Sequence, residues 1–385
     1  MKPISQTVEH YPPSGIRKFF DIVSQMDDVV SLGVGEPDFV TPWRIREAAI
    51  NSLERGRTSY TSNWGLLELR RVISRYLEGY SGLCYNPENS VLITVGVSEG
   101  MDLTMRTLLN PGDEVIITEP CYVSYKACVE LAGGKAVTVE AKKERDFVVD
   151  PKDIEAAVTD KTKAVLVSYP SNPTGAVADK KTLREIVDIA VKHDLYIVSD
   201  EIYDRLVYDG EHVSVPTLPG AFERTVLLNG FSKAYAMTGW RIGYAAGPTE
   251  VIKNMMKIHQ YTMLCAPINA QNAAIEAIVN GAKDREDMRR EYGRRRRVIV
   301  KGFREAGLDC FMPGGAFYAF PNVESTGLTS EEFCEKLLFE HKVAAVPGTA
   351  FGACGEGNIR CSYATSIEDI VTAIDRIKAF VAGLK

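Results

Sequence analysis

The feature that most constrains this chain is a regular alternation of short apolar runs with stretches of helical periodicity. In residues 181–193, for example, Leu183, Ile186 and Ile189 recur at helical spacing and therefore share one face. The apolar runs are almost continuous, which is typical of strands buried on both faces of a sheet. They cover residues 90–95, 114–118, 136–139, 164–168, 195–199, 225–228 and 242–246. Strands alternating with helices predict an α/β fold, with a mostly parallel seven-stranded sheet flanked by helices.

This rhythm is confined to the middle of the chain, which predicts two domains. From about residue 275 the sequence favours one long polar helix to about residue 306, then shorter segments and a final helix from Ser366. The first 45 residues or so are rich in Pro and Gly and lack the rhythm. We therefore expect a large domain over residues 46–280 and a smaller α+β domain from residues 1–45 and 281–385.

Composition and charge argue against several classes of protein. A net charge of −6 gives no general attraction to nucleic acid or to an anionic membrane. No apolar run approaches the ~18–20 residues of a membrane span, and the N-terminus lacks the apolar core of a signal peptide. The eight cysteines include no C-x-x-C pair and the five histidines show no ligand spacing, so no metal is expected. The arginines at 294–297 have acidic neighbours and should form a solvated helix face. We expect a soluble, cytoplasmic protein.

The segment NGFSKAYAMTGWRIG, residues 229–243, carries the strongest chemical signal. It follows an apolar strand, and such strand ends are where α/β sheets bind ligands. Ser232 and Arg241 suit an anionic phosphate, and Lys233 beside them suits a covalent bond to a carbonyl. A solvated surface lysine is the alternative. The segment resembles the pyridoxal-phosphate attachment motif of class I and II aminotransferases, and this resemblance makes Lys233 the cofactor-bonding lysine and Ser232 and Arg241 the phosphate ligands.

Two further motifs follow strands in the expected family order. SYPSNPTG could be only a tight turn, but the resemblance makes the Asn172 amide a donor to the cofactor's ring oxygen. VSDEIYDRL ends a strand in an acid, which is costly to bury without a positive partner. A protonated pyridine nitrogen is such a partner, so Asp200 fits as its counter-ion and Tyr203 can reach the ring hydroxyl. The competing interpretation is an Asp-Glu metal site, without accompanying ligands.

Three other segments would complete the cofactor site. The N–H groups around Val97, Ser98 and Glu99 begin a helix and form an anion site, although alone they indicate merely a capped helix. The segment is neither a G-x-G-x-x-G fingerprint nor a P-loop. Tyr122 resembles the aromatic residue that stacks on the pyridine, and otherwise is an ordinary buried tyrosine. Tyr60 resembles the tyrosine that touches the partner subunit's phosphate, which implies a homodimer with shared active sites.

Substrate recognition is predicted near both ends of the chain. Arg360 could form a structural ion pair. In the family, the arginine at this position binds the substrate α-carboxylate through two parallel hydrogen bonds. Gly35, in GVGEPDF, resembles the loop glycine that closes over the same carboxylate. Arg17 could supply a second cation for a side-chain carboxylate. Tyr11, Trp64 and Tyr261 could instead line a pocket for aromatic or aliphatic side chains.

The resemblance, from about residue 30 to 365, is to fold-type I pyridoxal-phosphate enzymes of the aspartate aminotransferase superfamily. It implies a ping-pong aminotransferase that uses pyridoxal 5'-phosphate and moves an amino group from an L-amino acid to 2-oxoglutarate. Aspartate, aromatic amino acids or alanine are the candidate donors, with aspartate slightly favoured. A β-lyase (C–S lyase) or a synthase would keep the same motifs. A cofactor-binding regulator would need a DNA-binding domain, for which the short N-terminus leaves no room.

Overall fold

The large sheet has seven strands and is confirmed as the framework of the fold. The structure is a computed structural model that describes residues 2–9, 11–12 and 26–384. In sheet order the strands are β2 (Val91–Thr94), β8 (Gly243–Ala246), β7 (Thr225–Gly230), β6 (Tyr196–Asp200), β5 (Thr162–Ser168), β3 (Glu114–Glu119) and β4 (Lys135–Glu140). All neighbours are parallel except β8, which is antiparallel to both β2 and β7. The apolar runs predicted as strands correspond to these seven.

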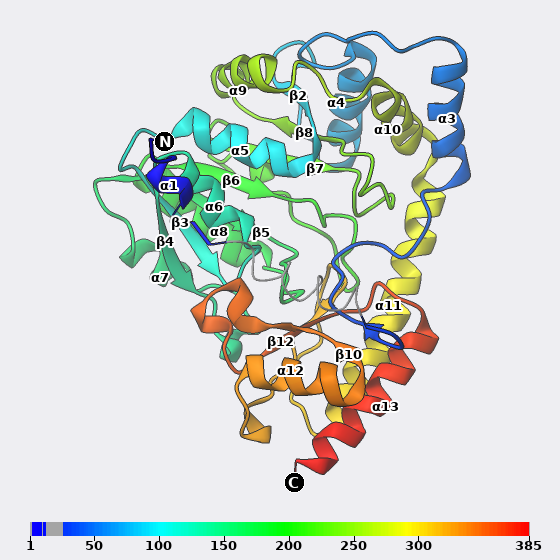
Figure 1. Cartoon of the computed structure of the whole chain (residues 1–385). Coiled ribbons are helices and arrows are strands. Elements are labelled where there is room, and N and C mark those ends of the chain that lie inside the picture. Colours follow the sequence, from blue (N-terminus) through cyan, green and yellow to red (C-terminus); the bar gives the residue numbers. More distant parts are fainter. Residues whose placement is uncertain (1, 10, 13–25, 385) are drawn as a thin grey trace.

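Helices cover both faces of this sheet, because alternate strand residues point to opposite sides (Figure 1). In β5, for example, Ala164 and Leu166 pack on one face and Val165 and Val167 on the other. The first face is covered by α5 (Gly96–Leu108), α6 (Ser124–Leu131) and α9 (Thr249–Thr262). The second is covered by α7 (Pro151–Ala156), α8 (Lys180–Lys192), α3 (Trp43–Glu54), α4 (Leu67–Ser81) and α10 (Ile268–Asn280).

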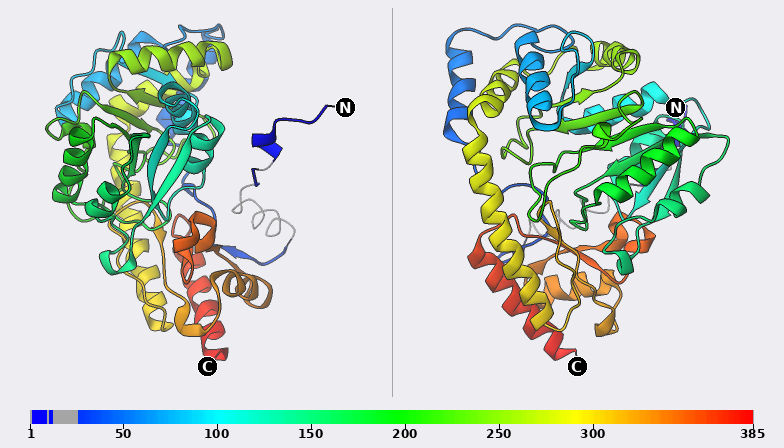
Figure 2. Two further views of the ribbon diagram at one scale, coloured as in Figure 1. Left: turned by 90° about the vertical axis from the view of Figure 1, so that its left-hand side faces the viewer. Right: turned by 180° about the vertical axis from the view of Figure 1, so that it is seen from behind.

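Further helices and strands, called the small unit below, lie under the large sheet (Figures 1 and 2). They pack around a hydrophobic cluster that also includes Tyr203 and Leu206 from the segment after β6. The helices of the small unit are α11 (Ala282–Glu305), α12 (Ser330–His341) and α13 (Ile367–Gly383). Its strands are β9 (Tyr318–Ala319), β11 (Val346–Pro347) and β12 (Ile359–Ser362) in one antiparallel sheet, and β1 (Val30–Ser31) paired in parallel with β10 (Val343–Ala344). The side chain of Ser366 accepts a hydrogen bond from the Asp369 amide and so caps α13.

Two expectations about the second half of the chain were wrong. The long polar helix expected from about residue 275 begins only at Ala282, as α11, because the residues before Gly281 belong to α10. The arginines at 294–297 do not all lie on a solvated face. Arg295 is buried and binds both carboxylate oxygens of Asp38, and Arg296 is buried and pairs with Asp209. Charge-rich helices can bury arginine where the fold supplies carboxylates, which sequence neighbours do not reveal.

The N-terminal segment contacts both units. β1 joins the small unit through its pairing with β10. The short helix α1 (Gln6–Glu9) lies instead near α6, beside the large sheet. Arg17 falls outside the described residues. Within the described residues, no helix is both long enough and apolar enough to cross a membrane.

Candidate active site

The predicted site residues follow strands whose ends meet at one edge of the large sheet. β3, β5, β6 and β7 are parallel, so their carboxyl ends lie together, and the antiparallel β8 begins at the same edge. This edge is where open α/β sheets bind ligands. A cavity of about 800 Å³ opens there. Eleven of the thirteen residues expected from the sequence line it: Gly35, Val97, Ser98, Tyr122, Asn172, Asp200, Tyr203, Ser232, Lys233, Arg241 and Arg360.

Lys233 follows β7 and reaches into the middle of the cavity. Its Nζ donates a hydrogen bond to the Gly35 carbonyl oxygen over 2.6 Å. Burial lowers the pKa of Lys233 to about 8; Glu36 opposes this shift, whereas Arg360 and Arg241 add to it. With such a pKa about a tenth of the amine is unprotonated at pH 7, enough for a nucleophile or a base.

Asp200, at the end of β6, is buried beneath the cavity. Its Oδ2 accepts a hydrogen bond from the Tyr125 hydroxyl over 2.8 Å, and its Oδ1 accepts one from the Ile202 amide over 3.1 Å. Burial raises the pKa of Asp200 to about 6, although both hydrogen bonds favour the charged form. Among the described residues, no lysine, arginine or histidine forms an ion pair with this carboxylate. A buried carboxylate of this kind calls for a cationic partner.

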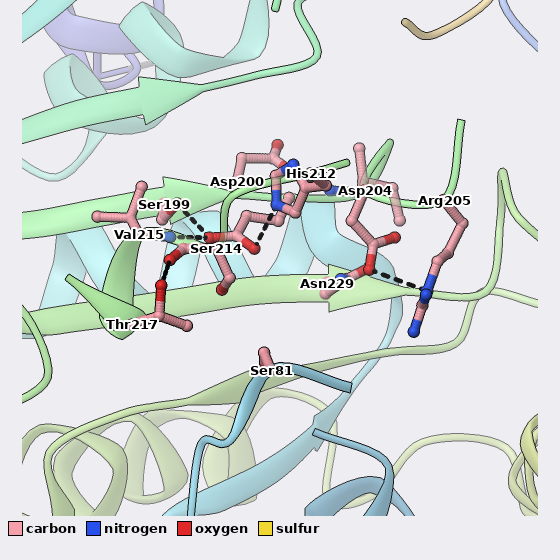
Figure 3. Close-up of polar contacts among 12 residues, drawn as sticks. Ser81, Ser199, Asp200, Asp204, Arg205, His212, Ser214, Val215, Thr217 and Asn229 are labelled. Atoms are coloured by element: carbon pink, nitrogen blue, oxygen red, sulfur yellow. Dashed lines mark hydrogen bonds and ion pairs between the residues drawn. The ribbon is translucent and has the colours of Figure 1, made fainter. Parts of the chain in front are cut away.

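A buried polar network supports the turn that begins at Asp200 (Figure 3). The next residue, Glu201, accepts hydrogen bonds from the Ser199 hydroxyl and the Val215 amide, each over 2.9 Å. Its other oxygen lies 2.8 Å from His212 Nε2. Burial would lower the pKa of His212, but Glu201 raises it above its ordinary value. The network holds the backbone on which Asp200 and Tyr203 are placed.

Arg360, on β12, is buried and has unused hydrogen-bonding capacity. Its Nη2 donates to the Gly33 carbonyl oxygen over 2.6 Å and its Nη1 to Asn172 Oδ1 over 3.0 Å. Its Nε atom has no partner, and within the described residues no carboxylate pairs with the guanidinium. Burial lowers the pKa of Arg360. A buried guanidinium that faces a cavity without an acid partner is suited to bind an anion.

A second anion site lies at the start of α5. Gly96 has a φ of 73°, and a Cβ there would lie 2.6 Å from Arg241 Nη2. A side chain at this position would therefore displace the Arg241 guanidinium, which lies beside the start of α5, where free N–H groups favour negative charge. Ser232 and Ser98 line the cavity from adjoining segments.

Glu99 is close to this anion site but is not on the cavity wall. Its carboxylate accepts a hydrogen bond from the Val95 amide over 2.5 Å and lies 2.6 Å from His259 Nδ1. Both side chains are buried. The Glu99 carboxylate thus stabilises the first turn of α5 without lining the cavity.

Two tyrosines of the site, Tyr125 and Tyr318, were not predicted from the sequence. Tyr125 stands three residues after Tyr122, and its hydroxyl contacts both Asp200 and Ser168. The Tyr318 hydroxyl lies 2.8 Å from that of Tyr203 and its ring lies against Arg360. The helical spacing of Tyr125 was a usable signal, whereas Tyr318 lies 115 residues beyond Tyr203 and gave none.

The remaining candidates lie away from the cavity. Tyr60 and Tyr261 are 81% and 87% exposed on the surface of the chain. Trp64 packs beside Arg70, and Tyr11 lies near Glu130 of α6. None of these four side chains lines a pocket for a substrate within this protomer.

The fold and the site define an α/β enzyme with a cavity lined by Lys233, Arg241 and Arg360 at one edge of its large sheet. The chain belongs to the class I and II aminotransferases, because this family matches residues 27–377. It is an aminotransferase with the α/β architecture of that family.

Full-length relatives agree with this assignment. YugH of Bacillus subtilis (strain 168), provisionally named an aminotransferase, is 54% identical over 378 residues, which cover 98% of both chains. An aspartate aminotransferase of Pyrococcus abyssi is 45% identical over 97% of both chains. Among solved structures, an aspartate aminotransferase of Thermus thermophilus with maleate has a TM-score of 0.94 and 40% identity, covering 98% of this chain and 100% of that one.

Proposed function

We propose that the cofactor is pyridoxal 5'-phosphate and that the enzyme transfers amino groups between L-amino acids and 2-oxo acids. The observation that carries this proposal is that Lys233 and Asp200, which form no ion pair with each other, line the same cavity. A buried amine of pKa about 8 suits a bond to an aldehyde, and a buried unpaired carboxylate suits a cationic ring nitrogen. The residues present therefore fit this cofactor.

Different residues of the chain would bind different parts of the cofactor. Arg241, Ser232 and the start of α5 would bind the phosphate, and Tyr122 would stack on the ring. Asp200 would keep the ring nitrogen protonated, and Asn172 and Tyr203 would bind the ring oxygen. When bound, the cofactor supplies an electron sink for the charge that develops on the substrate Cα.

Lys233 would then act as the base of the reaction. Its Nζ would take the proton from the substrate Cα, hold it as the ammonium, and later release it within the same cavity. Its pKa of about 8 lets it accept and release a proton near neutral pH. The hydrogen bond from the Tyr125 hydroxyl favours the charged form of the Asp200 carboxylate, so Asp200 would stay ionised during this transfer.

Arg360 would bind the substrate α-carboxylate, which both amino-acid and oxo-acid substrates carry. Gly35 supports this, because a Cβ there would lie 2.8 Å from the Tyr318 hydroxyl and 3.7 Å from Arg360 Nη1. A side chain at this position would crowd the carboxylate site. Relatives named for aspartate and for aromatic amino acids support those donors. The proposed acceptor is 2-oxoglutarate.

A homodimer with shared active sites is part of the proposal. Tyr60 is 81% exposed and would touch the phosphate bound by the partner subunit. Nearby apolar surface is available for the interface, including Tyr261, Met263 and Leu264. Mixing the inactive variants Lys233→Ala and Tyr60→Phe should restore activity through hybrid dimers that have one intact site. An active monomer in light scattering would contradict this arrangement.

The test of the activity is a panel of amino donors with 2-oxoglutarate fixed, scored by kcat/KM and by oxo-acid formation. Oxo acid should form without release of ammonia. If ammonia accompanied the product, the reaction would be an elimination. A kcat/KM for aspartate at least tenfold below that for phenylalanine or alanine would overturn aspartate as the favoured donor. The cytoplasmic location stays a prediction, to be checked by cell fractionation.

A further inference from the structure

The loop that carries Lys233 and Arg241 is strained and needs support. Ala236 and Arg241 have φ values of 53° and 51°, in the left-handed region that side chains disfavour. Each such residue costs on the order of 1 kcal/mol and persists only where its surroundings hold it. The support therefore has to come from other segments.

Residues 35–41, far away in sequence, provide that support at three points. The Gly35 carbonyl accepts from Lys233 Nζ over 2.6 Å. Glu36 Oε2 accepts from the Thr238 hydroxyl over 2.8 Å. The Thr41 hydroxyl donates to the carbonyl of the strained Ala236 over 2.5 Å and accepts from Trp240 Nε1 over 2.9 Å.

Of these hydrogen bonds, the one to Glu36 reaches the residue that also contacts Arg241. The Thr238 carbonyl accepts a hydrogen bond from Arg241 Nη1 over 3.0 Å, so Thr238 contacts Glu36 and Arg241 at once. Glu36 directly follows Gly35, whose carbonyl binds the reactive lysine. Two residues later Asp38 is held by Arg295 of α11. The Glu36 side chain thus joins a segment held by α11 to the loop that carries Thr238 and Arg241.

We propose that Glu36 is a positioning residue of the reaction, which holds Arg241 in place through Thr238 and sets the charge around Lys233. The second part follows from the groups that face Lys233. They include Glu36 and Asp200 as acids, Arg360 and Arg241 as cations, and the Tyr203 and Phe317 rings. Glu36 is the acid that most favours the ammonium form, opposing burial and the two arginines. The inference rests on the proposed function for its meaning in catalysis.

Two readouts separate these roles. The first uses the apoprotein: acetic anhydride labels unprotonated Lys233, and peptide mass spectrometry follows the labelling against pH. Glu36→Gln removes the charge, so the labelling midpoint should fall by about one pH unit from its value near 8. Glu36→Asp keeps the charge, so its midpoint should stay near the native value. Glu335→Gln, an exposed carboxylate on α12, is the matched control and should shift nothing.

The second readout is the dissociation constant of pyridoxal 5'-phosphate, from absorbance titration of the apoprotein. Thr238→Val keeps the shape but lacks the hydroxyl, so this constant should rise about three- to tenfold. Thr238→Ser keeps the hydroxyl and should restore binding to within about twofold. Circular dichroism checks that each variant is folded, and Glu36 is exposed, so its variants should fold.

Failure of the inference and failure of the proposed function give different results. If the wild-type protein does not bind the cofactor, the proposed function is wrong, whereas the labelling of apoprotein Lys233 still tests Glu36. If the cofactor binds normally but Glu36→Gln leaves the labelling midpoint unchanged, the electrostatic role is overturned. An unchanged dissociation constant in Thr238→Val would overturn the positioning role.

Discussion

Asn172 Oδ1 accepts a hydrogen bond from Arg360 Nη1 over 3.0 Å, joining residues 188 apart in the sequence. Because the amide oxygen is occupied, the amide NH₂ group of Asn172 is left to donate toward the cavity. The residue expected to grip the substrate thus orients the residue expected to bind the cofactor. On the proposed function, this one contact would link substrate recognition to cofactor recognition.

Replacing Arg360 should disturb both functions of this contact. Arg360→Lys keeps the charge but loses the planar fork that contacts Gly33 and Asn172. We expect kcat/KM for amino donors to fall about 100-fold, mainly through KM. Steady-state kinetics with a saturating acceptor measure this change. Arg290→Lys, on the exposed face of α11, is the control, and equal losses in both variants would contradict the assignment.

Replacing Lys233 should remove covalent attachment of the cofactor. Lys233→Ala leaves the phosphate site at Arg241 and Ser232, so the cofactor should still bind without a covalent bond. Borohydride treatment followed by peptide mass spectrometry should label Lys233 in the wild-type protein and nothing in the variant. Lys257→Ala, on α9, should be labelled as the wild type is. Labelling of a different lysine would refute the placement of the cofactor.

Removing the Tyr125 hydroxyl should move the acid limb of the pH profile. This hydroxyl donates to Asp200 and stabilises its charged form, so it keeps the pKa of Asp200 from rising further above about 6. Tyr125→Phe should therefore raise this pKa, and activity should be lost at a higher pH on acidification. The profile of kcat/KM against pH measures the shift. A profile identical to the wild type would show that Asp200 does not govern this limb.

The buried Asp200 carboxylate should also make the apoprotein less stable than an Asp200→Asn variant. Its pKa is raised from 3.8 to about 6, so the folded state holds a proton that the unfolded state releases between these values. The contribution of Asp200 to the free energy of unfolding is therefore fully present below about pH 4. It decreases as the pH rises to about 6 and is lost above pH 6. Asp200→Asn should raise the free energy of unfolding by about 3 kcal/mol at pH 8 and by less at pH 5. Urea unfolding measures this difference, and the exposed Asp375→Asn should show no such gain.

A side chain at Gly96 should weaken cofactor binding beyond its effect on stability. Gly96 and Gly82 have φ values of 73° and 74°, so alanine costs about 1 kcal/mol at either position. Only at Gly96 would the new Cβ meet Arg241, whereas Gly82 has no heavy atom within 4 Å. Gly96→Ala should therefore raise the cofactor dissociation constant at least about tenfold, and Gly82→Ala should leave it unchanged. Equal dissociation constants for the two variants would disprove a role for Arg241 at this site.

Much of the cavity wall could be predicted because strand ends are readable in the sequence. Tyr122, Asn172, Asp200 and Lys233 each follow an apolar run, and parallel strands bring such positions to one edge. The order of the strands, with β8 antiparallel, did not have to be known for this. The edge is shared because a parallel sheet places every carboxyl end on the same side.

The sequence by itself determined the seven strands, the chemical types at their ends and the family. Only the tertiary structure decided which of these groups meet. The contacts of Arg360 with Asn172, of Glu36 with Thr238 and of Arg295 with Asp38 join segments 188 to 257 residues apart. Local periodicity specifies secondary structure because it acts over a few residues. Long-range pairs depend instead on how the small unit packs against the sheet, which no local pattern encodes.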